Sequence, residues 1–198
     1  TLEAERSFRQ AAMLDPDCAI AYWGMAKANG KNEKRARAFI TEAVERKEGA
    51  GRLERMMIEA LNGYLHSKEK NKDKKTKAYF AELKKIAEEF PDELEAQAAH
   101  AYGLYRYRTT LKTSYEDAEE ALNKVLAVEP LHPAHHFRIH LWDYKEPAKA
   151  LNSAAKCGEA ASSIAHMWHM PGHIYSRLKR YSDAVWQQEA SARVDHAH

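Results

Sequence analysis

The sequence of 198 residues is 44% hydrophobic and 30% charged, and its formal net charge is +2. These values are typical of a folded chain and exclude a disordered one, while a net charge so close to zero indicates no particular class of partner. Glycine and proline are scarce, at 8 and 6 residues, and the strong helix formers Ala, Glu, Lys, Leu and Arg dominate, so we predict an all-α fold.

Helices are predicted along almost the whole chain, because apolar residues recur every three or four positions. Pro16 follows the first predicted helix, and Pro91 and Pro130 follow two later ones, as expected for a residue that cannot continue a helix. In chain order the predicted helices cover residues 2–14, 19–29, 33–47, 51–66, 75–89, 93–107, 115–128, 133–143, 147–157, 165–178 and 181–194.

One basic segment interrupts this pattern, between Lys68 and Lys77, with six lysines against two acidic residues. It lacks the arginines and interleaved aromatic residues of a nucleic-acid contact, so we interpret it as a solvated loop or helix start. No segment is long and apolar enough to cross a membrane. We therefore predict neither a nucleic-acid nor a membrane partner, and the compartment and the oligomeric state stay open.

The helices carry an internal repeat. Its second helix has small and large residues at fixed spacing and a closing proline, found at Ala4, Phe8, Ala11 and Pro16 and again at Ala118, Leu122, Val125 and Pro130. Its first helix is best seen at Trp168, Gly172 and Tyr175. This pattern resembles the tetratricopeptide-repeat (TPR) family. The resemblance implies antiparallel helix pairs stacked as an α-solenoid, with a concave groove lined by the first helices.

We therefore predict one TPR-like superhelical domain over residues 1–198, with about five helix pairs. Thr1 falls inside a second helix of the pattern, so we expect an excised or partial array. The resemblance also implies a peptide or protein partner in the groove.

Histidines are the most unevenly placed residues, because seven of the eleven lie between His132 and His173. In the second run, His166, His169 and His173 are three and four residues apart and share one helical face. In the first run, His136 and His140 share a face, whereas we expect His135 to point toward solvent. Imidazole is the commonest metal ligand among side chains, so two such faces on neighbouring helices predict a metal site.

We predict the metal ligands to be His132, His136, His140, His166, His169 and His173. Imidazole ligation suits a divalent transition metal such as Zn, Cu, Ni or Fe. Three alternatives stay open: histidines that bind an anionic group, a metal-dependent enzyme in which the ion activates water or oxygen, and a protein-interaction scaffold whose histidines are structural.

Both runs also resemble a pattern from a bacterial branch of TPR proteins. In this sequence the pattern is carried by His132-Pro133, His136 and Ile139-His140, and then by His166, His169-Met170-Pro171 and His173-Ile174-Tyr175. The resemblance implies the fold and the site but no reaction. The acidic residue expected near Asp143 is displaced from its usual position in the pattern, which leaves a carboxylate ligand in question.

Several catalytic motifs are missing from the sequence. Met170, Pro171 and Gly172 lie between His169 and His173, so the glutamate of a helical HExxH metalloprotease motif is absent. There is no glycine-rich phosphate loop, and Ser162 and Ser163 have no acid in register for a Ser-His-Asp site. We therefore predict no specific catalytic residue.

Overall fold

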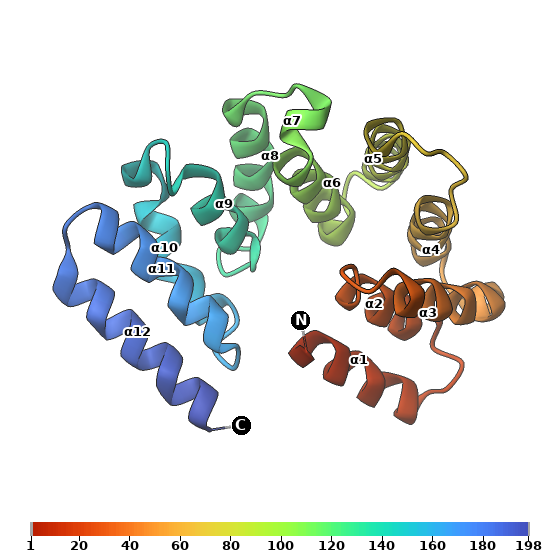
Figure 1. The fold of residues 1–198 in the computed structure, drawn as a ribbon, viewed down its shortest axis with the longest axis horizontal. Coiled ribbons are helices and arrows are strands. Elements are labelled where there is room, and N and C mark those ends of the chain that lie inside the picture. Colours follow the sequence, from red (N-terminus) through yellow and green to blue (C-terminus); the bar gives the residue numbers. More distant parts are fainter. Residues whose placement is uncertain (1, 198) are drawn as a thin grey trace. The chain divides into compact units, whose positions relative to one another are not determined.

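The computed structural model describes residues 2–197 and is helical throughout, with no strand in this range. Figure 1 shows the succession of helices along the chain. They are α1 (Leu2–Leu14), α2 (Ala19–Ala28), α3 (Glu33–Arg46), α4 (Arg52–Leu65), α5 (Lys72–Glu89), α6 (Leu94–Arg106), α7 (Arg108–Leu111), α8 (Tyr115–Val128), α9 (Ala134–Trp142), α10 (Leu151–Ala160), α11 (Ala165–Arg177) and α12 (Tyr181–His196), with 3₁₀ turns at Lys47–Gly49 and Pro147–Ala150.

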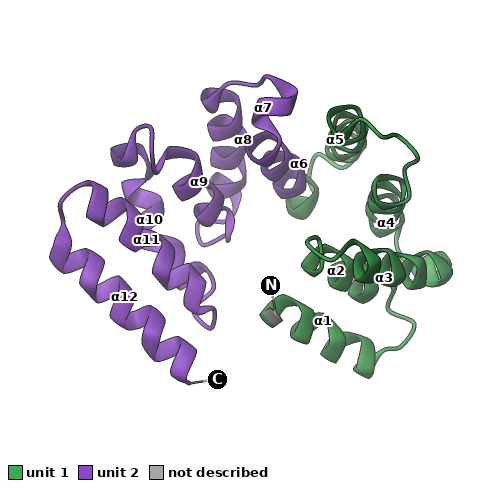
Figure 2. Cartoon of the chain, in the orientation of Figure 1, with its two compact units in different colours: residues 1–96 green, residues 97–198 purple. Residues whose placement is uncertain are grey.

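The chain forms two compact units, residues 1–96 and residues 97–198 (Figure 2). In each unit, helices that follow one another along the chain pack together, from α1 to α5 in the first and from α8 to α12 in the second. Each amphipathic helix thus buries its apolar face against its chain neighbours, as in repeat proteins. None of the helices between residues 2 and 197 is both long and apolar enough to span a bilayer.

The core of the first unit follows the predicted pattern of small and large residues. Ala36, Ile40 and Ala43 on α3 are fully buried, three and four residues apart. Gly24 on α2 lies directly against Phe8 of α1, because a Cβ at this glycine would be 2.4 Å from the Phe8 ring. The missing side chain therefore lets α1 and α2 approach closely.

In the second unit, a capping box starts α8, since Ser114 and Asp117 each accept a hydrogen bond from the other's backbone N–H. A partly buried polar network then joins α8 to α9. The Glu119 carboxylate accepts hydrogen bonds from Arg138 Nη2 at 2.7 Å and from Trp142 Nε1 at 3.1 Å. These bonds satisfy polar groups that would be costly to bury alone, and they fix the rotation of α9 about its axis.

Glycines also set the contacts of α11 with the helices before and after it. The Trp168 ring covers Gly158 of α10, where a Cβ would lie 2.3 Å from Trp168 Cε3. Gly172 faces α12, where a Cβ would lie 2.0 Å from Gln188 Nε2. Tyr175 is buried. The predicted roles of Trp168, Gly172 and Tyr175 in packing between helices are thus confirmed.

The observed helices differ from the predicted ones in three places. The helix predicted over residues 147–157 starts as the 3₁₀ turn Pro147–Ala150 and continues as α10, which ends at Ala160. Helix α5 begins at Lys72 rather than at residue 75, because the Asn71 side chain caps it by accepting a hydrogen bond from the Lys74 N–H. The short helix α7 was not predicted, since its four residues, Arg108–Leu111, are too few for a periodic pattern. The lysine-rich segment is an exposed loop followed by the first turns of α5, as expected.

Candidate metal centre

Helix α9 presents two histidines to one side. Its buried face includes Ile139 and Trp142, and His136 and His140 lie beside this face, one turn apart. Their ring centroids are 4.7 Å from each other. His136 is partly buried and His140 is exposed, so the pair runs from the helix packing to the surface.

Helix α11 presents three histidines in a stripe. Met167, Met170 and Ile174 form its buried face, and each is preceded in the sequence by a histidine of the stripe: His166, His169 and His173. The ring centroids of His166 and His169 are 5.9 Å apart, and those of His169 and His173 are 4.8 Å apart. The helical period therefore carries the imidazoles along α11 beside its packed face.

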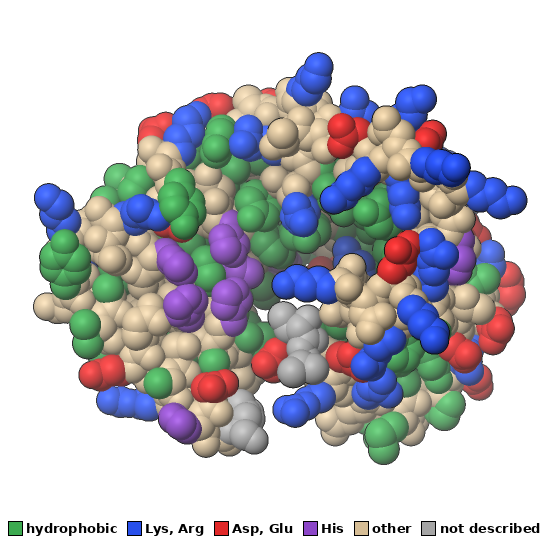
Figure 3. Space-filling view, viewed as in Figure 1, with side chains coloured by type: hydrophobic (Ala, Val, Ile, Leu, Met, Phe, Trp, Pro, Cys, Tyr) green, Lys and Arg blue, Asp and Glu red, His purple; other side chains and the backbone are tan. Residues whose placement is uncertain are grey.

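The two histidine faces meet, because α9 and α11 contact each other directly. The ring centroids of His136 and His166 lie 4.9 Å apart across this contact, with the rings perpendicular. One ring nitrogen from each of His136, His140 and His166 lies within 4.8 Å of the other two. In Figure 3 histidine side chains gather in one patch on this unit. We call His136, His140, His166, His169 and His173 the histidine patch.

Burial keeps His136 neutral at physiological pH. The pKa of His136 is lowered to about 3, mainly by burial and in smaller part by charge repulsion from His140 and His166. The His136 Nε2 atom is buried and has no hydrogen-bond partner among residues 2–197. Burial also lowers the pKa of His140, reinforced by His166 and His173 and opposed by Asp143. Neutral imidazole is the form that binds metal ions.

His169 and His173 form a close pair beside this triad. Their Nε2 atoms are 3.0 Å apart. His169 Nδ1 lies 2.7 Å from the amide oxygen of Gln188 on α12, and His173 Nδ1 lies 3.9 Å from the carboxylate of Asp143. The Asp143 side chain is only 4% exposed and also accepts a hydrogen bond from Arg177 Nε at 3.2 Å.

The other two histidines of the first run hold the start of α9. His132 Nδ1 accepts a hydrogen bond from the Ala134 N–H at 3.0 Å. His135 was expected to face solvent, and this is wrong, because it is 2% exposed. Its Nδ1 lies 3.0 Å from Ser153 Oγ and its Nε2 lies 2.9 Å from the Pro130 carbonyl oxygen. Both ring nitrogens are therefore satisfied within the packing of α9 against α10.

Aromatic side chains border the patch on the α6 side. The Tyr105 ring is stacked on His140, with centroids 6.3 Å apart and planes inclined by 14°. Phe137 lies next to Tyr105, with centroids 6.0 Å apart. Burial raises the pKa of the Tyr105 hydroxyl. This border is aromatic, and the polar groups described above reach the patch from α9, α11 and α12.

Of the two groups that orient the histidine pair, Asp143 had been left in question as a carboxylate ligand, and sequence reasoning missed Gln188. Asp143 is three residues after His140, and residues at this spacing are neighbours on a helix surface. This spacing could have predicted the place of Asp143 beside the patch. Gln188 has no such signal, because it comes from α12, fifteen residues after His173.

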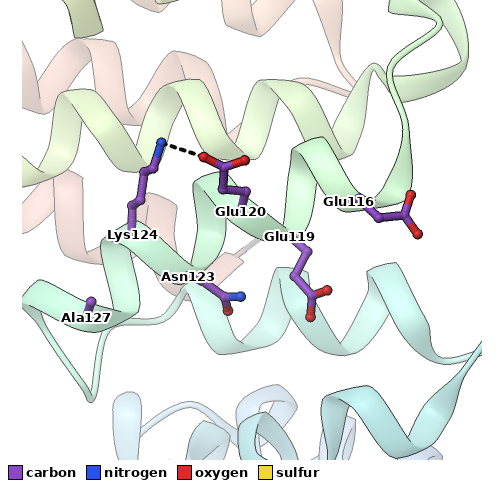
Figure 4. A pocket seen from close by; sticks show the side chains of 6 residues that line it. All are labelled: Glu116, Glu119, Glu120, Asn123, Lys124 and Ala127. Atoms are coloured by element: carbon purple, nitrogen blue, oxygen red, sulfur yellow. Dashed lines mark ion pairs between the residues drawn. The ribbon is translucent and has the colours of Figure 1, made fainter.

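A second hollow lies along α8 and is shown in Figure 4. Every residue that lines it belongs to this helix: Glu116, Glu119, Glu120, Asn123, Lys124 and Ala127. Its acidic groups are already paired, since Glu119 contacts Arg138, Glu120 contacts Lys124 and Glu116 is 4.0 Å from Lys145. The histidine patch, in which ring nitrogens from two helices converge, is therefore the better candidate site.

Comparison with known proteins identifies the fold. No protein-family profile matches the sequence, and no curated protein matches it. Among solved structures, MamA from Desulfovibrio magneticus RS-1 (residues 41 to the end) is 13% identical, covering 91% of this chain and 96% of its own at a TM-score of 0.55. MamA MSR-1 is 12% identical, covering 96% and 98% at 0.53.

A third structure is YrrB, described as a TPR protein with an unusual peptide-binding site. It is 16% identical and covers 98% of this chain and 95% of its own, with a TM-score of 0.51. Identities this low show the architecture alone. Together with the helix pairing described above, they establish that the chain has an all-α, TPR-like solenoid fold built from helix pairs.

Proposed function

We propose that the second unit binds a divalent transition-metal ion through His136, His140 and His166. The observation that supports this most is the convergence of three ring nitrogens within 4.8 Å of one another. Ligands 2.0–2.1 Å from a tetrahedral zinc ion are about 3.3 Å apart. Small side-chain rotations would bring the three nitrogens to that spacing.

The chemistry of the donors fits such an ion. His136 is neutral, with a pKa of about 3, so a metal ion does not have to compete with a proton there. Its buried Nε2 has no hydrogen-bond partner among the described residues, and a metal bond would compensate an otherwise costly buried polar group. Three imidazoles suit Zn, Cu, Ni or Fe, and zinc is the simplest probe because it has no redox chemistry.

Zinc binding to the full chain, after removal of metals with a chelator, tests the proposal. We expect zinc to raise the free energy of unfolding by about 2.7 kcal/mol when its free concentration is a hundred times the Kd. The double variant His140→Ala, His166→Ala should lose the part of this gain that comes from the triad, and because both residues are exposed it should still fold. The matched control His66→Ala, His196→Ala removes two exposed histidines elsewhere. Equal stabilisation of both double variants would contradict the proposal.

The open side of the triad supports a second candidate, a metal-dependent enzyme. His140 and His166 are exposed, and three protein ligands with an accessible fourth position are the arrangement in which zinc activates water. Hydrolysis of an activated ester by the zinc-loaded chain, lost in the His140→Ala, His166→Ala variant, would support this candidate. No hydrolysis above the rate of free zinc would count against it.

A role in binding a peptide or protein partner is also proposed, on two grounds. The fold is that of TPR proteins, and YrrB, one of the similar structures, is described as having a peptide-binding site. The motifs around His132-Pro133 and His169-Met170-Pro171 further support membership of the bacterial TPR branch. Peptide-array binding by the chelator-treated chain separates this role from metal binding, since a scaffold should select peptides without any ion.

A further inference from the structure

Gln188 determines which nitrogen of His169 carries the proton. The amide nitrogen of Gln188 donates a hydrogen bond to the His169 carbonyl oxygen at 3.2 Å, so the amide oxygen is the atom that faces the ring, 2.7 Å from Nδ1. An amide oxygen only accepts hydrogen bonds. His169 Nδ1 must therefore carry the hydrogen, and in the neutral ring Nε2 is left as a bare lone pair.

Asp143 favours the same arrangement in His173. Its carboxylate oxygen lies 3.9 Å from His173 Nδ1, and the side chain is held in place by burial and by Arg177. A carboxylate attracts an N–H and repels a nitrogen lone pair, so it favours the tautomer with hydrogen on Nδ1. In that tautomer His173 Nε2 is also a bare lone pair.

The two bare nitrogens face each other at 3.0 Å. Two lone pairs at this distance repel, unless a positive group lies between them. Two nitrogens bound to one metal ion are about 2.9 to 3.4 Å apart, depending on the angle at the metal. Metal-binding histidines almost always donate their other N–H to a carboxylate, carbonyl or similar oxygen. The Gln188 oxygen is at hydrogen-bond distance from His169 Nδ1, and the Asp143 carboxylate is on the same side of His173 at 3.9 Å.

We infer that His169 and His173 bind a second transition-metal ion through their Nε2 atoms. Gln188 and Asp143 orient the two rings from behind, and water or another ligand completes the coordination. His166 belongs to the triad and is also near this pair, with its ring 4.9 Å from that of His136 and 5.9 Å from that of His169. The histidine patch thus takes two neighbouring ions per chain, one more than the proposed function requires.

The competing arrangement is a proton shared by the two Nε2 atoms, with no second ion. The shared proton and the second ion predict different numbers of zinc ions bound per chain. Calorimetric zinc titration of the chelator-treated full chain measures this number, and elemental analysis after dialysis measures it independently. We expect two zinc ions for the wild type and one for His169→Ala, His173→Ala. The variant His140→Ala, His166→Ala should keep the ion at the pair.

The single-ion outcomes are distinguishable. One ion in the wild type that is kept in His169→Ala, His173→Ala would overturn this inference and leave the proposed function standing. If the wild type binds one ion and only His169→Ala, His173→Ala loses it, the proposed function would be overturned and the site at His169 and His173 supported. No zinc binding at all would overturn both.

A second experiment tests the orientation of the rings without touching a histidine. Gln188→Leu removes the acceptor behind His169, and Gly172→Ala displaces the Gln188 side chain, because the new Cβ would lie 2.0 Å from its Nε2 atom. Loss of an outer acceptor typically weakens metal binding 10- to 100-fold. Both variants should weaken the second zinc ion by about this factor, whereas Gln188→Glu, which keeps an acceptor oxygen, should not.

The metal-free chain gives an independent readout. Long-range proton–nitrogen NMR spectra of the imidazoles should show His169 and His173 with hydrogen on Nδ1. A spectrum with hydrogen on His169 Nε2, or equal zinc affinity in Gln188→Leu and the wild type, would contradict the inference.

Discussion

Lowering the pH from 7 to 5 should destabilise the metal-free chain through His136. Burial lowers its pKa from the ordinary value of 6.5 to about 3, so at pH 5 the folded state leaves this ring neutral while the unfolded state protonates it. The unfolded state then binds more protons, and stability falls as the pH drops below 6.5 until it levels off near 3. Between pH 7 and pH 5 this one ring costs about 2 kcal/mol.

Urea denaturation in the presence of chelator, followed by circular dichroism at both pH values, measures the loss. His136→Gln is the matched variant, since glutamine fills part of the space and does not titrate. Other buried histidines contribute equally to both proteins, so the wild type should lose about 2 kcal/mol more than the variant. Equal losses would refute the reasoning, because they would mean that His136 is solvated in the folded state.

Two further predictions concern packing and helix capping. Gly158→Ala should lower the free energy of unfolding by about 1–3 kcal/mol, because the new Cβ would overlap the rigid Trp168 ring. The control Gly63→Ala replaces an exposed helical glycine whose Cβ would have no described atom within 4 Å, and it should raise the free energy of unfolding by up to about 1 kcal/mol. If urea denaturation showed that Gly158→Ala stabilises the protein, the contact with Trp168 would be contradicted. Ser114→Ala should cost about 1 kcal/mol by breaking the capping box with Asp117, and it should speed amide hydrogen exchange in the first turn of α8; unchanged exchange there would count against the cap.

The sequence predicts the helices well, because their signals are local. Apolar residues such as Ala36, Ile40 and Ala43 recur every three or four positions on one helical face, and they are buried as expected. Prolines and caps then fix the ends to within a few residues. Two of the exceptions, α7 and the early start of α5, depend on a single turn and on one capping side chain, Asn71, which periodicity does not detect.

The candidate site was predictable only in part. Helical spacing alone puts His166, His169 and His173 on one face, and the repeat pattern puts the helix with His136 and His140 beside it. Neither spacing nor the repeat pattern gives the rotation of α9 about its axis. This rotation is fixed by bonds that Glu119 and Ser153 make from other helices, and for this reason the prediction for His135 was wrong.

Gln188, which orients the ring of His169, could not be predicted from residue spacing. Gln188 approaches His169 only because Gly172 leaves room for α12 to pack closely on α11. Two residues of different helices, neither of them a histidine, therefore decide the tautomer of a third. Such an arrangement depends on the three-dimensional contact and leaves no periodic trace in the sequence.

The contact between His136 and His166 joins one helix pair to the next. An ion bound there would be a reversible cross-link between consecutive repeats of the second unit, in addition to the apolar packing that already connects them. The stability of a repeat protein is roughly the sum of the stabilities of its repeats and of the interfaces between neighbouring repeats. The concentration of available metal would therefore change the stability of this interface, and with it the rigidity of the array, without any change in the sequence.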